Sequence, residues 1–387
     1  MSKPLATKQS EVEPIESDVK PKSSAVEEEV IDPKVIEICK NIMSVGEECT
    51  TQRELLELVK YHHSTGFEKP IVCYDGFEPS GRMHLAQGFM KANIVNKLTE
   101  NGCHFKFWVA DKFAKMNHKL GGDNKKIRKA GELMIEIWKL CGMDMDKVEF
   151  IWASEEIAKH SEEYYDRVND IAQNITVNDI LKCTPIMGRS EADSLSASQF
   201  LYPLMQCADI FQLKVNICQL GMDQRKVNML ARDYCSKKKI KRGRPIILSH
   251  HMLMGLNGST KMAKSDPENT IFMDDMPMDV KRKIKKAFCE PNNIEKNPIL
   301  EYIKHILLPR FKMIEFTRKE EYGGNVSYSD YDKLENDFKD GKLHPNDLKT
   351  MAIKQIIEML EPVQTAMSQD ENLKKLNNLV KKYKLTK

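Results

Sequence analysis

The sequence lacks long apolar runs, and this absence excludes an integral membrane protein. A helix that crosses a bilayer needs roughly 18 or more apolar residues in succession, and no stretch of the 387 residues approaches that length. Residues 1–16 have no apolar segment of a signal peptide, and their acidic side chains differ from the Arg-rich composition of a mitochondrial presequence. We therefore expect a cytoplasmic protein with no membrane partner.

The sequence also lacks the cysteine spacing of a metal site or a disulfide framework. The 10 cysteines are scattered along the chain, with no Cys-x-x-C pair and no His/Cys pairing at zinc spacing. This pattern predicts free thiols in a reducing compartment and no protein-held metal.

Net charge is nearly absent as well, because the chain contains 60 Lys and Arg and 57 Asp and Glu, which gives a formal charge of +3. The charge is unevenly distributed, with −4 in residues 1–33, +1 in residues 34–279 and +6 in residues 280–387. Residues 1–33 are rich in Glu, Ser, Pro and Lys and have few large apolar groups, so we expect a flexible acidic extension. The basic excess at the other end is compatible with a polyanionic partner.

Apolar runs and helical periodicities alternate from residue 34 to about residue 280, which predicts an α/β fold with a doubly wound parallel sheet. Beyond about residue 280 the pattern is helical and shows no convincing strand. The expected strands are 70–74, 104–110, 148–152, 214–218 and 245–248, and the expected helices are 84–101, 125–141, 223–234, 299–311 and 348–360.

A turn rich in small residues follows the first expected strand, between Gly76 and Gly81, and a helix begins near His84. The free backbone N–H groups and the dipole at a helix N-terminus suit a phosphate, and an imidazole there can also donate to it. An ordinary strand-to-helix turn capped by Ser80 is the alternative.

A second segment, residues 258–267, carries Lys261 and Lys264 between a glycine and a proline, followed by the hydroxyl of Ser265. Two ammonium groups on a mobile loop can bind a polyphosphate. The alternative is a solvated loop.

The third segment, residues 201–211, predicts a largely buried helix with Pro203 in its first turn. Tyr202, Gln206 and Asp209 have the spacing i, i+4, i+7 and therefore share one face. These buried polar groups need partners, which are either backbone groups or an amphiphilic phenol or amino acid. Residues 221–224, after a strand end, add a carboxylate and an amide at the edge where such sheets bind ligands.

In this order the segments resemble a class I aminoacyl-tRNA synthetase, and within that class the tyrosyl-tRNA synthetases of eukaryotic/archaeal type. The stretch from His84 to Gln87 is similar to the HIGH motif with its last His replaced by Gln, and residues 261–265 match KMSKS with Ala263 for the first Ser. The resemblance covers residues 34–360. It implies a Rossmann-like catalytic domain, 34–279, followed by an α-helical anticodon-binding domain, 280–387.

The resemblance implies a ligase that activates L-tyrosine with ATP and Mg²⁺ and then transfers it to the terminal adenosine of tRNA(Tyr), working as a homodimer. The tyrosine pocket would consist of Tyr74, Tyr202, Gln206, Asp209 and Gln224. The ATP site would consist of Gly76, Ser80, His84, Gln87, Gly221, Asp223, Met252, Leu253, Lys261, Lys264 and Ser265. Of these, His84, Lys261 and Lys264 would be catalytic, because they would neutralise the charge that develops on the phosphates.

In the C-terminal domain the resemblance implies anticodon contacts by Tyr322, Asn346 and Asp347, with Tyr322 stacking on a base and Asp347 accepting from a guanine. A turn and a helix cap at residues 344–347 is the alternative. A basic run at residues 237–244 is either an acceptor-stem contact or a solvated face.

Two other functions stay open at this point. Tryptophanyl-tRNA synthetases share the fold and both ATP motifs, but an indole has no phenolic hydroxyl for Tyr74 and Asp209 to bind. A non-catalytic RNA-binding or signalling relative would tolerate the loss of His84 and the two lysines, which are present here.

Overall fold

The computed structural model describes residues 31–188 and 194–384 and is built around a six-stranded sheet with the order β1-β6-β5-β2-β3-β4. Strands β2 to β6 are mutually parallel, and β1 runs antiparallel to β6 at one edge. The strands are β1 Glu48–Thr50, β2 Ile71–Phe77, β3 Cys103–Val109, β4 Val148–Trp152, β5 Ile217–Cys218 and β6 Ile246–Ser249.

The parallel part of this sheet starts at the centre, with β2, and is built outward in two directions. From β2 the chain proceeds through β3 to β4 on one side, and then through β5 to β6 on the other. The direction of winding therefore reverses between β2 and β5. In such sheets the loops at the carboxyl ends of the two strands diverge at the reversal and leave a crevice.

Helices cover both faces of the sheet, because alternate residues of each strand point to opposite sides. Ile246 and Leu248 pack with α1, α2, α3 and α5, whereas Ile247 packs with α6 to α10. The helices are α1 Pro33–Met43, α2 Gln52–Ser64, α3 Lys91–Thr99, α4 Asp111–Met116, α5 Asn124–Leu140, α6 Ala153–Lys159, α7 Ser161–Asn174, α8 Val177–Lys182, α9 Ala197–Gln212 and α10 Arg225–Lys237.

The sequence predicts the five parallel strands but not the sheet's antiparallel edge. The strand β1 is only three residues long and has no alternating pattern to detect. Strand β5 is shorter than expected, since Lys214 adopts a left-handed backbone conformation (φ 54°) and the chain is still turning there. The sheet is thus mixed, with a parallel centre.

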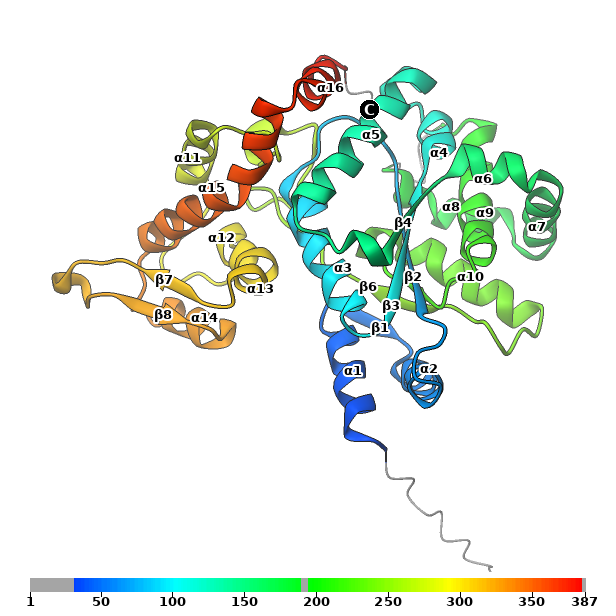
Figure 1. Cartoon of the computed structure of the whole chain (residues 1–387), viewed down its shortest axis with the longest axis horizontal. Helices are drawn as coiled ribbons and strands as arrows, with labels where there is room; N and C mark the ends of the chain where they lie inside the picture. Colours follow the sequence, from blue (N-terminus) through cyan, green and yellow to red (C-terminus); the bar gives the residue numbers. More distant parts are fainter. Residues whose placement is uncertain (1–30, 189–193, 385–387) are drawn as a thin grey trace, which may run out of the picture.

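The C-terminal part is mainly helical, as expected, and lies to one side of the sheet (Figure 1). Its helices are α11 Pro277–Lys286, α12 Pro298–Tyr302, α13 Leu308–Phe311, α14 Tyr331–Lys339, α15 Pro345–Gln369 and α16 Glu371–Lys381, and a π-helical turn, Ile303–Leu307, joins α12 to α13. The expectation of no strand beyond residue 280 is wrong, because β7 Ile314–Phe316 pairs with β8 Val326–Tyr328 in a hairpin. Strands of three residues are too short for period-2 alternation to be recognised.

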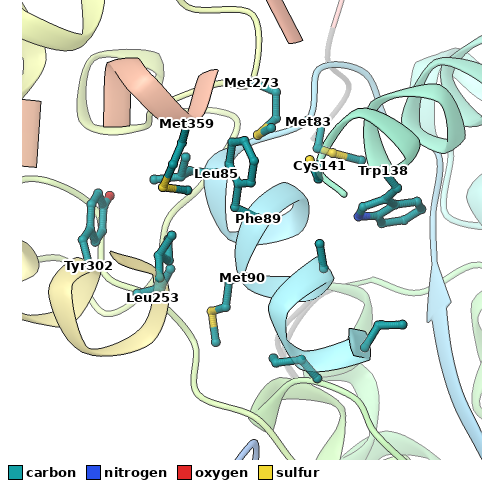
Figure 2. Close-up of a cluster of buried hydrophobic side chains, with 14 of the residues drawn as sticks. Met83, Leu85, Phe89, Met90, Trp138, Cys141, Leu253, Met273, Tyr302 and Met359 are labelled. Carbon is teal, nitrogen blue, oxygen red and sulfur yellow. The ribbon is translucent and has the colours of Figure 1, made fainter. Parts of the chain in front are cut away.

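The hydrophobic core continues from the sheet into the C-terminal helices. Figure 2 shows Leu85 and Phe89, at the start of the helix after β2, lying between Met359 of α15 and Met273, with Tyr302 of α12 nearby. The division of the chain at residue 280 therefore stays a prediction, and the expected extension 1–33 lies, except for its last three residues, outside the described residues.

Ion pairs reinforce this junction in a group that we call the acidic clamp, Asp274 and Asp275. Arg82, from the turn after β2, donates to Asp274 (2.7 Å) and Asp275 (3.0 Å). Lys381 of α16 contacts Asp274 at 2.8 Å, and Lys283 of α11 contacts Asp275 at 2.5 Å. The clamp joins three stretches that are distant in sequence, namely the turn with Arg82, residues 274–283 and the end of α16.

Candidate active site

A cavity of about 750 Å³ lies at the carboxyl ends of β2 and β5, where the winding of the sheet reverses. The structure brings every expected residue of the tyrosine pocket and the ATP site to its wall: Tyr74, Gly76, Ser80, His84, Gln87, Tyr202, Gln206, Asp209, Gly221, Asp223, Gln224, Met252, Leu253, Lys261, Lys264 and Ser265. Four stretches far apart in the chain therefore form one concave site: β2 with the turn after it, α9, residues 221–224 after β5, and the loop after β6.

Asp209 is a fully buried acid on α9. Its Oδ1 accepts a 2.7 Å hydrogen bond from the hydroxyl of Tyr164 on α7, whereas Oδ2 has no hydrogen-bond partner among the described residues. Burial raises the pKa of Asp209, while Tyr164 and the nearby indole N–H of Trp108 lower it, although the indole makes no hydrogen bond of acceptable geometry. An unpaired buried oxygen of this kind is available to a polar group of a ligand.

Tyr74, on the central strand, lies beside Asp209. Its side chain is 1% exposed, and burial and the charge of Asp209 both raise the pKa of its hydroxyl. A Cβ at residue 76 would lie 3.2 Å from that hydroxyl, so glycine at position 76 leaves room for the ring to fold back. Two hydroxyl-binding groups therefore occupy one end of the cavity.

Tyr202 has a partner that the sequence analysis missed. Its hydroxyl donates to Glu78 at 2.7 Å, and Glu78 also accepts from Asn117 and faces Lys119 at 3.8 Å. Burial raises the pKa of Glu78, and Lys119 is the main cause that lowers it. Glu78 follows β2 directly, and that position was its only signal in the sequence.

The helix that carries this face differs from the expectation at its start. Pro203 lies inside α9 and not in its first turn, because a capping box of Ser196 and Gln199 begins the helix at Ala197. Further along, Gln206 donates to Gln224 at 3.1 Å, and Gln224 donates to the Ile186 carbonyl. The two amides therefore hold each other at the cavity wall.

His84 is a neutral hydrogen-bond donor in this structure. Its Nδ1 accepts from the backbone N–H of Gln87 at 3.3 Å, so the neutral ring carries its hydrogen on Nε2. Burial, assisted by the charge of Lys264, lowers the pKa of His84 to about 3. The expected helix from residue 84 begins with a π-helical turn, Ala86–Met90.

Gln87 stands where the HIGH motif has its last His. Its backbone carbonyl accepts from the Trp138 indole at 2.7 Å, and its side-chain Oε1 is buried without a partner among the described residues. The backbone of Gln87 is thus held by Trp138, and its side-chain oxygen is available to a ligand.

The two lysines of the loop after β6 differ in environment. Lys264 donates to Ser80 at 3.1 Å, and burial together with the charge of Lys119 lowers its pKa to about 7, against the opposing effect of Glu78. Lys261 is half exposed and lies 3.7 Å from Asp223. Ala263 contributes only its backbone carbonyl, which accepts from Thr270.

The expected anticodon residues lie outside the cavity, around the β7–β8 hairpin. Tyr322 is 65% exposed in the turn between the strands. Asp347 accepts from the His344 backbone N–H at 3.0 Å, so the helix cap considered as the alternative is present at the start of α15. Asn346 donates its backbone N–H to the His344 ring. Arg318 connects the two segments, because it donates to the Gly324 carbonyl and lies 3.9 Å from Asp347.

The other expectations concern surface charge, thiols and metals. In the basic run at residues 237–244, Lys238 pairs with Asp170, and Lys237 and Arg244 bond neighbouring oxygens. All the cysteines are free, as expected. Residues 31–188 and 194–384 contain neither a group of three or more His, Cys, Asp or Glu placed to hold a metal ion nor a helix that could cross a membrane.

The sequence model of the family "tRNA synthetases class I (W and Y)" matches residues 66–361. A tyrosine–tRNA ligase of Arabidopsis thaliana, named cytoplasmic, is 52% identical over 349 residues, which are 90% of this chain and 89% of that protein. A tyrosine–tRNA ligase of the archaeon Thermococcus onnurineus is 35% identical over 80% of this chain and 90% of its own length.

Solved structures give the same result. A tyrosyl-tRNA synthetase of Leishmania major, in complex with tyrosinol, has a TM-score of 0.82 and 46% identity; the match covers 90% of this chain but only 52% of the Leishmania chain. The Pyrococcus horikoshii tyrosyl-tRNA synthetase, in complex with L-tyrosine, has a TM-score of 0.80 and 30% identity, with 90% and 100% covered. A tryptophanyl-tRNA synthetase of Aeropyrum pernix, at 17% identity and a TM-score of 0.59, is similar in fold alone.

Proposed function

Because the chain belongs to the class I tRNA synthetases for tryptophan and tyrosine, we propose that it is a tyrosine–tRNA ligase that uses ATP and charges tRNA(Tyr). The single observation that carries the choice of tyrosine is the free oxygen of Asp209 beside the Tyr74 hydroxyl, at the buried end of the cavity. A phenolic hydroxyl can donate to the Asp209 oxygen and accept from the Tyr74 hydroxyl. An indole N–H can only donate and leaves the Tyr74 hydroxyl without an acceptor, and a phenyl ring leaves both groups unpaired.

In this proposal the cavity holds tyrosine with its ring toward β2 and its amino and carboxylate groups toward Tyr202, Gln206 and Gln224. The Glu78 carboxylate, which fixes the Tyr202 hydroxyl, adds a negative charge that suits an ammonium group. Discrimination against phenylalanine then comes from buried polar groups left unsatisfied; tyrosyl-tRNA synthetase is itself the standard illustration of this principle.

ATP occupies the other end, with its ribose near Asp223, its adenine near Met252 and Leu253, and its phosphates at the turn from Gly76 to Gln87. The tyrosine carboxylate attacks the α-phosphorus in line, a new P–O bond forms, and pyrophosphate leaves with the electron pair of the broken bond. His84 donates through Nε2, and Lys261 and Lys264 neutralise the triphosphate. Catalysis consists of positioning and charge stabilisation, and no side chain acts as a nucleophile.

In the second step the terminal adenosine hydroxyl of the tRNA attacks the carbonyl carbon of the adenylate, and AMP leaves. Mg²⁺ would enter with ATP as the counterion of its phosphates. Tyr322, Asn346 and Asp347 contact the anticodon of tRNA(Tyr).

We also propose that two chains form a homodimer and that the enzyme works in the cytoplasm, like the plant relative whose name says so. Exposed apolar side chains on two neighbouring helices, Val177 of α8 and Leu201 of α9, support a protein partner on that side. Sedimentation at micromolar concentration tests the dimer: a species of about 45 kDa, the mass of one chain, would contradict it.

Pyrophosphate exchange into ATP tests the proposed function. We expect exchange that depends on tyrosine and Mg²⁺ and is at least 1000-fold weaker in kcat/KM with phenylalanine, roughly in line with hydroxyl-based discrimination in this class. Exchange that depends on tryptophan would show the alternative enzyme. Folded protein without any amino-acid-dependent exchange would show a non-catalytic relative, and both results would refute the proposal.

A further inference from the structure

Four polar side chains form a continuous chain of hydrogen bonds along the floor of the cavity. Asp75 is on β2, Lys91 is the first residue of α3, Gln219 follows β5 and His250 follows β6. All four stand at the carboxyl edge of the sheet, and all but Gln219 line the cavity itself. The roles proposed above use none of them.

Lys91 is the centre of this chain. Its ammonium group lies 2.5 Å from Asp75 Oδ2, 2.7 Å from Gln219 Oε1 and 3.3 Å from the Gln219 carbonyl oxygen. Lys91 is 6% exposed and Gln219 is fully buried. Three acceptors therefore match the three N–H donors of an ammonium group, which has no acceptor of its own.

This arrangement fixes the orientation of the Gln219 amide. Because Lys91 can only donate, Oε1 faces the lysine, and the NH₂ group faces His250 Nδ1 at a distance of 3.0 Å. An amide NH₂ is also only a donor, so Nδ1 must accept, and the neutral ring carries its hydrogen on Nε2. The ring is neutral because burial, followed by the charges of Lys91, His251 and His305, lowers the pKa of His250.

The Nε2 atom of His250 lies next to the segment proposed to bind the nucleoside. His250 forms a parallel bridge with Gly221, and its backbone carbonyl accepts from the Met222 backbone N–H. A Cβ added to Gly221 would lie 3.5 Å from His250 Nε2 and 2.8 Å from Asp223 Oδ1. The same Cβ would lie 2.6 Å from the Met252 sulfur, so only glycine lets these three side chains approach residue 221 so closely.

We propose that His250 binds the nucleoside of ATP, donating its Nε2 hydrogen to an acceptor on the ribose or the adenine, and that Asp75, Lys91 and Gln219 are positioning residues that hold this tautomer. The inference rests on the proposed function, which puts the nucleoside beside Asp223. Ribose oxygens and adenine ring nitrogens are acceptors that such a donor fits.

A purely structural role for the same residues makes a different prediction. Lys91 and Asp75 join α3 to β2, and the Gln219 backbone N–H donates to the Tyr74 carbonyl at 2.9 Å. Damage to the packing would therefore spread to Tyr74 and weaken tyrosine binding and ATP binding together. A tautomer effect changes ATP binding alone.

The first variant is Gln219→Glu, which has the same shape but places an acceptor opposite Nδ1 and so moves the ring hydrogen from Nε2 to Nδ1. We expect calorimetry at pH 8 to show ATP binding weakened about tenfold, the worth of one hydrogen bond, with tyrosine binding within twofold of the parent. The control is Gln52→Glu, which adds the same charge at an exposed position on α2. Equal losses for ATP and tyrosine would overturn the proposal.

Two variants at residue 250 separate the effect of the His250 hydrogen bond from the effect of the charge that Gln219→Glu adds. His250→Gln keeps a donor near the position of Nε2, whereas His250→Leu removes it, so we expect near-parental ATP binding in the first and about tenfold weaker binding in the second. Parental ATP binding in His250→Leu would overturn the proposal even if Gln219→Glu is impaired, because the added charge alone would then explain that defect.

Nitrogen-15 spectra report the tautomer directly. The His250 ring, assigned by its loss in His250→Gln, should show a protonated Nε2 in the parent and a protonated Nδ1 in Gln219→Glu; a protonated Nδ1 in the parent would overturn the proposal. ATP binding and the tautomer are both measured without turnover, so they test the role of His250 independently of the reaction. Absence of tyrosine-dependent exchange would refute the proposed function only.

Discussion

Replacement of Asp209 by leucine tests how the cavity selects its amino acid. Leucine has a similar shape but no acceptor, so in the Asp209→Leu variant a phenolic hydroxyl loses the carboxylate and keeps only the Tyr74 hydroxyl as a neighbour. The Tyr164 hydroxyl, which donates to Asp209 at 2.7 Å, can turn fully to the Met205 carbonyl, 3.2 Å away. The substitution therefore removes the ligand's acceptor without leaving Tyr164 unpaired.

The size of the effect follows from the burial of the site. A buried hydroxyl left without a partner costs about 1–3 kcal/mol, and 1.4 kcal/mol is a factor of ten. We therefore expect kcat/KM for tyrosine to fall about 5- to 150-fold in Asp209→Leu. With phenylalanine, which has no hydroxyl, the rate should be unchanged or higher, so the preference for tyrosine should decrease by at least the same factor.

Pyrophosphate exchange with each amino acid measures this ratio, and Asp146→Leu, at an exposed position, is the control.

The Asp209→Leu variant should also alter the pH dependence of stability. A carboxyl whose pKa is raised by folding holds more protons in the native state than in the unfolded state, so the parent loses stability as pH rises through 4 and above. Between pH 5 and pH 8 the melting temperature of Asp209→Leu should therefore fall less than that of the parent. An unchanged amino-acid preference would refute the reasoning.

Three further predictions concern the cations and the anticodon site. Lys264→Ala should lower the adenylation rate at least tenfold in single-turnover experiments, as expected for loss of a charged hydrogen-bond donor, while tyrosine affinity, measured by equilibrium dialysis, changes little. Because the pKa of Lys264 is about 7 in the free protein and a triphosphate favours its charged form, ATP binding should take up a proton at pH 7–8; calorimetry in buffers of different ionisation enthalpy measures this uptake, which Lys264→Arg should abolish. Asp347→Asn retains a cap acceptor but loses the carboxylate, so KM for tRNA should rise about tenfold with adenylate formation unchanged; a loss of both would make Asp347 purely structural.

Much of the cavity could be predicted because its residues come in short, ordered segments. Tyr202, Gln206 and Asp209 follow helical spacing, so their common face is visible in the sequence, and the order of the three motifs matches a known family. Asp347 illustrates a limit of this reasoning, since one carboxylate can both cap a helix and contact a base, and its spacing to His344 is the same in both cases.

Residues that act through long-range packing could not be predicted. Tyr164 comes from α7 and meets Asp209 only after the sheet has brought α7 and α9 together. The buried pair of Lys91 and Asp75 joins a helix to a strand, with no periodicity that relates them. Likewise β1, β7 and β8 form because partners are available in three dimensions, and strands of three residues contain too little alternation to be seen beforehand.

The acidic clamp connects the end of α16 to the chain segment that follows the loop with Lys261 and Lys264. Lys381 and Arg82 share Asp274, which stands just beyond the segment carrying Lys261 and Lys264. Loss of the Lys381 contact would leave Asp274 paired, among the described residues, with Arg82 alone. In the proposed ligase we therefore expect a fusion or substitution at the end of α16 to change the rate of adenylation, although α16 contributes none of its described residues to the cavity.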